Sequence, residues 1–316
     1  MGKITFLEEV QFGVPDLEKA KQFFKDWNLQ VAQDDPDCGV FQTLEGACVV
    51  VKRADDPTLP PPAEPGICLR KIVWGVESAN DLDSIAARLA DYTSVSRDSA
   101  GNVSVNDPSG YALAFRVSTL KKLPPVEVNV NYPGVPVRVN QPIDGTIRPA
   151  VRHLGHIAIF VTDFNESVKF YQDLLQFRPS DLYEGRGVFL RSPGSNEHHN
   201  LFLVSRDGLR GVHHISFEVQ NFHELMQGGI YMQQRGWSTH QGPGRHRLGS
   251  NFFWYFHTPF EGTCEYYSDM DVLDDNWELK VWEYSPDMFY YWTTQPGGVI
   301  STVDLTKTEQ EFRDGI

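Results

Sequence analysis

A pattern of strand and helix signals that returns four times constrains this 316-residue chain more than any other feature. The segment 153–171 can be laid over the segment 6–24, with strand, helix-cap and helix positions in register. Self-similarity of this kind indicates repeated structural units. The sequence therefore predicts a chain built from duplicated modules.

Each predicted module consists of a strand, a helix and then further strands. In the first module, 10–14 alternates as a strand and 17–27 has helical spacing. In the second module, 71–76 and 79–89 repeat that order. With the β-rich runs that follow each helix, these signals predict two βαβββ modules in the first ~117 residues.

The same order restarts near residue 152, after a stretch with prolines at six positions that indicates an extended linker. The predicted fold class is therefore α+β, with two domains of two βαβββ modules each. The predicted divisions are 1–117 for the first domain, 118–150 for the linker, 151–268 for the second domain and 269–316 for an aromatic-rich tail packed on it.

Composition limits the partners that the chain can have. The net charge is -14 and no run of Lys or Arg occurs, which argues against nucleic acid and anionic membranes as partners. No apolar signal segment opens the chain and no 18-residue apolar run crosses it, so we expect a cytoplasmic protein. The four cysteines lack metal-type C-x-x-C spacing and are expected to be ordinary buried thiols.

Two histidines occupy the same place in consecutive modules. In the strand 211–219, strict alternation puts His214 on one face with Ser216 and Glu218, and His213 on the apolar face. A lone histidine on such a strand is usually an ordinary half-exposed residue. His156 holds the equivalent position one module earlier, whereas His153 falls on the opposite face, so the pair His156 and His214 favours a shared site.

A carboxylate in the last strand of the fourth module completes this set. Alternation places Glu265 on one face with Thr263 and Tyr267. A glutamate on an edge strand facing water is the common alternative, but burial among aromatic residues requires pairing or a cation. Two imidazoles and one carboxylate form the facial triad that binds non-haem Fe(II), and Mn(II) can use the same ligands.

Other proton-handling side chains occur in the same half of the chain. His199 begins a strand, His246 lies in a glycine-rich segment that reads as a loop, and Tyr255 lies in an aromatic strand. Each has an ordinary alternative, namely a surface histidine, a solvated loop histidine and a core tyrosine respectively. Together with the predicted triad, they are candidates for catalysis.

Six motifs in the second half, in this order, resemble the type I extradiol ring-cleaving dioxygenases of the vicinal oxygen chelate superfamily, such as catechol 2,3-dioxygenase and biphenyl-2,3-diol dioxygenase. The motifs are Leu-Gly-His156, Glu-His-His199-Asn-Leu, Val-His-His214-Ile-Ser-Phe, Gly-Arg-His246, Tyr255 and Thr-Pro-Phe-Glu-Gly-Thr-Cys-Glu265-Tyr.

The resemblance implies a function for each of these positions. His156, His214 and Glu265 are expected to bind Fe(II), or Mn(II), while a catechol or trihydroxybenzene chelates the metal and dioxygen opens its ring beside the diol. The residue at His199 is expected to assist proton transfer. Those at His246 and Tyr255 are expected to hydrogen-bond substrate oxygens. The resemblance also implies degradation of aromatic compounds and a homo-oligomer.

The first half departs from this pattern, because the equivalent metal positions are predicted to be Glu9, Lys71 and Leu113, which cannot form the triad. A metal-free first domain is therefore expected. Two alternative functions remain open: a glyoxalase-like lyase or isomerase, whose metal site typically has two glutamates, and a non-catalytic binding protein on the same fold.

Overall fold

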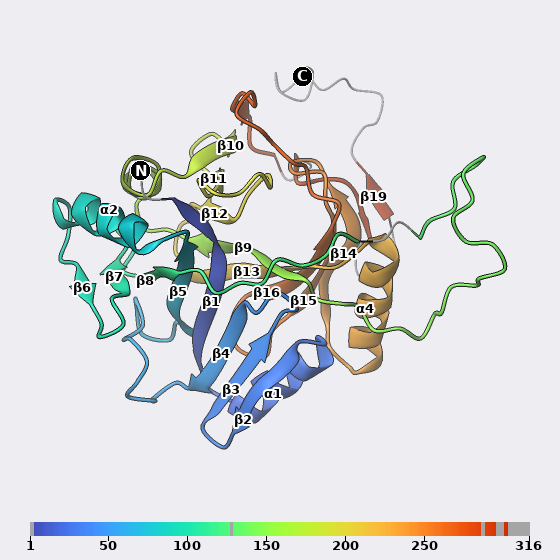
Figure 1. The fold of residues 1–316 in the computed structure, drawn as a ribbon, viewed down its shortest axis with the longest axis horizontal. Helices are drawn as coiled ribbons and strands as arrows, with labels where there is room; N and C mark the ends of the chain where they lie inside the picture. Colours follow the sequence, from blue (N-terminus) through green and yellow to red (C-terminus); the bar gives the residue numbers. More distant parts are fainter. Residues whose placement is uncertain (1–2, 127–128, 286–287, 295–299, 303–316) are drawn as a thin grey trace.

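The computed structural model describes residues 3–126, 129–285, 288–294 and 300–302, and it contains two large mixed sheets (Figure 1). Each sheet is built from two successive βαβββ modules. The predicted α+β fold with repeated modules is confirmed.

The first half supplies the first sheet and two helices. Its elements are β1 (Ile4–Val14), α1 (Leu17–Asp26), β2 (Gln30–Asp35), β3 (Cys38–Gln42), β4 (Cys48–Arg53), β5 (Leu69–Val76), α2 (Ala79–Ala90), β6 (Ser96–Arg97), β7 (Val103–Asn106) and β8 (Ala112–Val117).

The second half repeats this order and adds strands from the tail. Its modules contain β9 (His153–Phe160), α3 (Phe164–Lys169), a π-helical turn η1 (Phe170–Leu174), β10 (Arg178–Tyr183), β11 (Gly187–Arg191), β12 (Leu201–Val204), β13 (Gly211–Glu218), α4 (Phe222–Gln234), β14 (Thr239–His246), β15 (Phe252–His257) and β16 (Thr263–Ser268). The tail contributes β17 (Lys280–Trp282), β18 (Tyr290–Thr294) and β19 (Ile300–Thr302).

The centres of the two sheets have the same topology. The first sheet contains the order β4-β1-β5-β8 and the second contains β12-β9-β13-β16. In both, the two middle strands are antiparallel and each outer strand is parallel to its neighbour. In this order β9 takes the place of β1, β13 that of β5 and β16 that of β8.

Each helix begins at a residue that caps its first turn. The side chains of Asp16, Ser78, Asp163 and Asn221 each accept a hydrogen bond from the backbone N–H three residues later. Such caps stabilise a helix start because the first N–H groups have no partner within the helix. These local signals explain why helix starts could be predicted from the sequence.

One face of each sheet is buried in a common apolar core. In the second half, Ile157, Ile215 and Cys264 lie in this core, and Tyr266 stacks on Trp27 of the first half with ring centroids 3.8 Å apart. Because strand side chains alternate, the neighbouring residues of β9, β13 and β16 are on the other face of the sheet. That other face carries the candidate site.

Three of the sixteen strands in the four modules were missed by sequence reasoning. The residues of β2 are all exposed and give no apolar alternation. The prediction named no strand for β10 either. The segment of β14 contains Gly242, Pro243 and Gly244 and reads as a loop, whereas the structure pairs it with β15 and β18. His246 therefore ends a strand, so its assignment to a loop was wrong.

The strand register corrects one position in the first half. Ile72 pairs with Leu113 in the same way as Ile215 pairs with Cys264, so Glu265 corresponds to Ala114 and not to Leu113. Leu113 lies in the apolar core on the helix side of the sheet. The equivalents of the triad are then Glu9, Lys71 and Ala114, which still lack two histidines.

The segment 118–150 connects the two halves and extends past α4 in Figure 1. Its described residues form no helix and no extended strand, and the guanidinium of Arg148 lies 3.3 Å from the ring centroid of Tyr231. Within the described ranges, every helix is too short or too polar to cross a bilayer. All four cysteines are free thiols.

Candidate metal centre

Three buried side chains from adjacent strands converge on one point. The ligand atoms offered by His156, His214 and Glu265 lie within 4.8 Å of one another. The two Nε2 atoms are 3.0 Å apart, and Oε2 of Glu265 lies 3.1 Å from Nε2 of His156 and 3.7 Å from Nε2 of His214. The three predicted ligand positions are thus brought together.

The sheet topology explains this convergence. β13 lies between β9 and β16, and its Ser216 is opposite His156 on one side and Glu265 on the other. The three strands come from two modules, so the site forms only when the modules pair. Ser216 also donates a hydrogen bond of 2.6 Å to Oε2 of Glu265.

Glu265 is a buried carboxylate that has no Lys or Arg among its described partners. It is 0% exposed, and its described partners are Ser216, Asn251 and histidines. Burial acts to raise the pKa of Glu265, but its interactions with the neighbouring histidines, His156 first, outweigh burial and hold that pKa well below its usual range. A buried carboxylate needs compensating charge, which a bound cation can supply.

The imidazole of His214 is neutral and is held by its neighbour. Burial, followed by the charge of His213, holds the pKa of His214 well below its usual range. Neutral imidazole and ionised carboxylate are the forms that bind metals. Nδ1 of His214 lies 2.7 Å from Nδ1 of His213, which leaves Nε2 of His214 to point at the triad.

A β-bulge places His213 in the pocket, so its assignment to the apolar face was wrong. Val212 is opposite Ile159 and His214 is opposite Ala158, which leaves His213 as an extra residue in β13. A bulge interrupts alternation, so two consecutive side chains can point to the same side. Burial, with a contribution from His240, lowers the pKa of His213 to about 4.

His156 is oriented by packing. Its Nδ1 is buried and has no hydrogen-bond partner among the described residues. The ring instead lies against His199 and Tyr267, with centroid distances of 4.2 and 5.4 Å. Nε2 of His156 is therefore the ring nitrogen that faces His214 and Glu265 and can bind a metal.

His246 and Tyr255 form a hydrogen-bonded pair beside the triad. Nδ1 of His246 lies 2.7 Å from the backbone oxygen of Phe289, and its Nε2 lies 2.9 Å from the hydroxyl of Tyr255. A carbonyl oxygen can only accept, so Nδ1 carries a hydrogen, and in the tautomer with that single hydrogen Nε2 accepts the Tyr255 O–H. Burial and the nearby Glu265 raise the pKa of Tyr255 well above its usual range.

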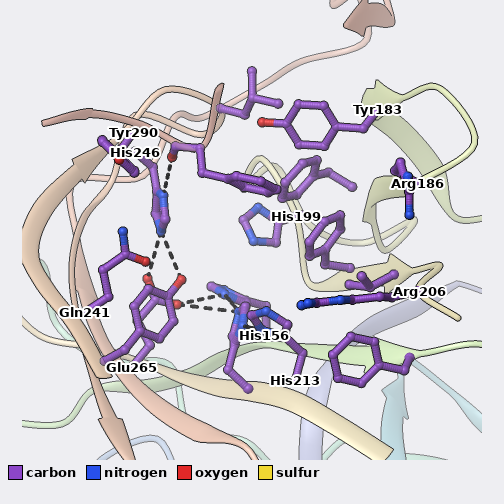
Figure 2. Close-up of a pocket in the computed structure, with 18 of the residues that line it drawn as sticks. His156, Tyr183, Arg186, His199, Arg206, His213, Gln241, His246, Glu265 and Tyr290 are labelled. Atoms are coloured by element: carbon purple, nitrogen blue, oxygen red, sulfur yellow. Dashed lines mark hydrogen bonds and ion pairs between the residues drawn. The ribbon is translucent and has the colours of Figure 1, made fainter. Parts of the chain in front are cut away.

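His199 lies in the same pocket and is 4% exposed. Burial, followed by the charge of His156, holds its pKa well below the usual range. Its Nδ1 lies 3.0 Å from Nδ1 of His198. All six candidate residues named from the sequence therefore line one pocket (Figure 2).

The pocket has a volume of about 680 Å³, which is within the range of small-molecule sites. Its aromatic wall contains the rings of Phe189 and Phe202, stacked with centroids 4.0 Å apart. Figure 2 shows Arg186 and Arg206 on the side away from His246 and Gln241. The tail also reaches this pocket through Tyr284, Phe289 and Tyr290.

Sequence reasoning missed several residues of the pocket. His240 and Gln241 lie on β14, the strand that was not predicted, and Asn251 precedes β15. Arg186 and Arg206 lie in turns that flank β11 and β12. Strand alternation extended through β14 would have indicated which of its side chains share a face. No local sequence signal marks Arg186 or Arg206 as pocket residues.

A family model supports the assignment of the second half. Residues 153–266 match the Glyoxalase/Bleomycin resistance protein/Dioxygenase superfamily. This segment holds both histidines, the glutamate and the three further candidate residues. The chain therefore contains a domain of this superfamily, and the recognised resemblance is confirmed at that level.

Curated relatives are similar to part of the chain. "Metapyrocatechase 2" of Cupriavidus necator is 33% identical over 142 residues, which cover 45% of this chain and 44% of the relative. An iron-dependent extradiol dioxygenase of Rhodococcus jostii is 28% identical over 132 residues, or 38% of this chain and 39% of that protein. Each match thus spans less than half of the relative.

Solved structures share the fold over nearly the whole chain. The Mn(II)-bound glyoxalase from Novosphingobium aromaticivorans has a TM-score of 0.72 and 22% identity, covering 98% of this chain and 99% of that one. Homoprotocatechuate 2,3-dioxygenase from Arthrobacter globiformis has a TM-score of 0.72 and 20% identity, covering 92% and 88%. At these identities the likeness shows the fold alone.

Proposed function

We propose that this protein is a metal-dependent extradiol dioxygenase that cleaves the ring of a catechol or trihydroxybenzene. The observation that carries the proposal is the joint presence, in one pocket, of a His-His-Glu cluster and three proton-handling side chains. Simple sequestration of a ligand needs no such groups, which argues against a binding protein. The partial similarity to named dioxygenases supports the same assignment.

The residues present fit a divalent metal, and His156, His214 and Glu265 are the proposed ligands. Three donors converge, two are imidazoles, and the buried carboxylate has no described Lys or Arg partner. This donor set suits Fe(II), and Mn(II) as well. When bound, such a metal supplies a Lewis-acidic centre with open positions for a diol and dioxygen.

The residues around the proposed metal ligands are proposed to transfer a proton, to hydrogen-bond the substrate and to pack against its ring. His199 is proposed to accept a proton from a substrate hydroxyl, since it is neutral and lines the pocket. Tyr255 and His246 present an O–H and a ring nitrogen beside Glu265, where they can hydrogen-bond substrate oxygens. Preplaced donors of this kind stabilise charge that develops during reaction. Phe189 and Phe202 supply an apolar wall for an aromatic ring.

The glyoxalase-like alternative is less well supported by the site. The described residues contain one His-His-Glu cluster with a single carboxylate, whereas a site with two glutamates is typical of that chemistry. The similarity to a Mn(II)-bound glyoxalase concerns the fold. An assay of lyase and isomerase activity on the same metal-loaded preparation provides a direct comparison.

The first prediction concerns turnover and ligation. Protein purified without oxygen and loaded with Fe(II) should consume one O2 per catechol and retain both oxygen atoms in a yellow ring-opened product. His214→Ala should abolish metal binding in a titration followed by metal analysis, because it removes one of three ligands. His240→Ala is the matched control, since it removes a pocket histidine outside the cluster and should keep the metal.

One outcome would contradict the proposed function, and another would contradict the ligand assignment. The dioxygenase proposal fails if metal-loaded protein consumes no O2 with a panel of catechols and trihydroxybenzenes. The ligand assignment fails if His214→Ala retains the metal with wild-type affinity. Parallel loading with Mn(II) compares the two metals.

A further inference from the structure

A chain of buried hydrogen bonds leads from the tail of the protein to His199. Nε1 of Trp282 donates to Oδ1 of Asp181 at 2.7 Å, and Oδ2 of Asp181 lies 2.6 Å from Nε2 of His198. Nδ1 of His198 then lies 3.0 Å from Nδ1 of His199. None of the four side chains is more than 4% exposed.

The fold brings these residues together from distant positions. β17 lies beside β10 in parallel, with Lys280 opposite Asp181 and Trp282 opposite Tyr183. The ring of Phe189, on β11, packs against both histidines, with centroid distances of 5.4 Å to His198 and 4.9 Å to His199. The side chains are therefore fixed by packing as well as by hydrogen bonds.

With one hydrogen on each histidine ring, the chemistry of the groups sets the direction of every hydrogen bond in this series. An indole N–H can only donate and an ionised carboxylate can only accept, so Nε2 of His198 carries a hydrogen and donates it to Asp181. In the His198 tautomer with its single hydrogen on Nε2, Nδ1 is an acceptor. The hydrogen between the two rings must belong to Nδ1 of His199, which leaves Nε2 of His199 without one.

We infer that Asp181 and His198 are positioning residues that fix His199 in the tautomer with a bare Nε2. In the part of the chain that is described, Nε2 of His199 has no hydrogen-bond partner, and the ring lines the pocket. This inference rests on the proposed function. As a diol binds, the hydroxyl O–H bond breaks and the proton forms a bond to Nε2, while the oxygen keeps the electron pair.

The same arrangement also stabilises the charged form of His199. After Nε2 takes the proton, the imidazolium keeps its Nδ1–H donated to His198, whose own N–H points at the Asp181 carboxylate. Two aligned hydrogen bonds connect the new positive charge to a buried negative one. Asp181 acts through His198 and touches no reacting atom.

Asp181→Asn tests the direction of these hydrogen bonds, because the amide has almost the same shape as the carboxylate. Trp282 can only donate, so the amide oxygen must face it and the amide NH2 must face Nε2 of His198. Both following hydrogen bonds reverse, and His199 receives a hydrogen at Nε2. We expect kcat to fall about 100-fold or more, the scale of a lost general base, with metal content and KM within about twofold of wild type.

A rescue variant separates this role from a structural one. Asp181→Asn combined with Trp282→Phe removes the donor that fixes the amide, so the amide can turn its oxygen to His198 and restore the original direction. The double variant should recover at least tenfold in kcat over Asp181→Asn, whereas Trp282→Phe alone should stay close to wild type. A purely structural role predicts that the two losses accumulate.

A second measurement requires no turnover. In metal-free protein with 15N-labelled histidine, the ring signals of His199, assigned by comparison with His199→Gln, should show a protonated Nδ1 and a bare Nε2. Asp181→Asn should exchange the two patterns. A wild-type ring protonated at Nε2, full activity of Asp181→Asn, or absence of rescue would each overturn the inference. Wild-type protein that consumes no O2 but shows the expected ring signals refutes the proposed function alone.

Discussion

His246 determines whether the hydroxyl of Tyr255 donates or accepts the hydrogen bond between them. The backbone oxygen of Phe289 holds Nδ1–H of His246, so the Tyr255 hydroxyl donates to Nε2 when the pocket holds no substrate. A substrate oxygen that enters beside Glu265 can compete for this hydroxyl. The pair therefore offers one donor at a position fixed in advance.

Removal of that hydroxyl gives a prediction at the scale of one residue. Tyr255→Phe should lower kcat about 100-fold, because one preplaced donor is lost, and should leave metal affinity unchanged. Steady-state O2 consumption and metal titration measure the two quantities. Tyr284→Phe removes a hydroxyl from the same pocket that has no hydrogen-bond partner among the described residues, and it should stay within about twofold of wild type.

Individual residues of the candidate site were predictable where strand alternation held. His156, Glu265 and Tyr255 follow the period-two pattern, and the structure places each on the pocket side. His198 was not predicted to belong to the site, yet it is 0% exposed and hydrogen-bonded to Asp181. No local signal could show this, because the partner is 17 residues away on β10 and His198 itself lies in the segment between β11 and β12.

The bulge in β13 is the main departure at the scale of an element. It adds one residue opposite Ile159 and Ala158, so that His213 and His214 both line the pocket. The Nδ1 atoms of the two rings are 2.7 Å apart. If Nε2 of His214 binds the metal, its Nδ1–H must donate to His213, which is neutral.

His213→Leu should weaken metal binding about 10-fold to 100-fold, the usual effect of losing an outer hydrogen-bond partner of a ligand. His213→Gln should recover part of the affinity, because the amide oxygen can accept the same hydrogen. Competition with a chelator measures both values. Equal affinity of His213→Leu and wild type would show that packing alone orients His214.

At the scale of the whole molecule, Asp107 links the two halves through Tyr171. Its Oδ2 accepts from the Tyr171 hydroxyl at 3.0 Å, and its Oδ1 accepts the N–H groups of Ser109 and Tyr111 at 2.9 Å. Tyr111 in turn donates to the backbone oxygen of Phe160. Burial raises the pKa of Asp107 to about 6, although hydrogen bonds from Tyr111 and Tyr171 oppose the shift.

This raised pKa predicts how stability depends on pH. The folded protein binds a proton at Asp107 more tightly than the unfolded chain, so this stabilisation is complete below about pH 4 and is lost as pH rises through about 6. Asp107→Asn cannot ionise. Its stability relative to wild type should therefore increase between pH 4.5 and 7.5, by about 2 kcal/mol.

Urea unfolding of metal-free protein at the two pH values measures this difference. Asp98→Asn is the control of opposite sign, because hydrogen bonds from Asn102 lower the pKa of the exposed Asp98. Its stability relative to wild type should decrease, not increase, as pH rises. A constant difference between Asp107→Asn and wild type would contradict the assigned pKa.

The charge of the pocket predicts which substrates are preferred. The molecule has a net charge of -14, yet the described pocket lining contains Arg186 and Arg206 and only one carboxylate, Glu265. Figure 2 shows both arginines on the side away from His246. If the proposed function holds, a catechol with an anionic substituent should be a better substrate than an uncharged one.

Arg206→Met should lower kcat/KM for 3,4-dihydroxyphenylacetate about tenfold, the lower range for a charged hydrogen bond, and leave 4-methylcatechol within about twofold. Arg210→Met is the matched control, since Arg210 pairs with Glu64 away from the pocket. A similar loss for both substrates would assign Arg206 a structural role.

We also propose the domain division 1–117, 118–150, 151–268 and 269–316, which follows the two sheets and the strands of the tail. Assembly into a homo-oligomer stays a prediction. Exposed apolar side chains in the connecting segment, including Tyr132, Val135 and Val139, give such an interface a place to form.

The sequence by itself determined the repeated modules, the helix starts and the faces of the regular strands. These features depend on hydrophobic periodicity, helix-capping residues and the alternation of strand side chains, which all act over a few residues. Tertiary structure alone decided the bulge at His213, the pairing of the glycine-rich β14 and the chain from Trp282 through Asp181 and His198 to His199. Those features arise where strands distant in sequence pack together, so the energy that fixes them is absent from any local segment.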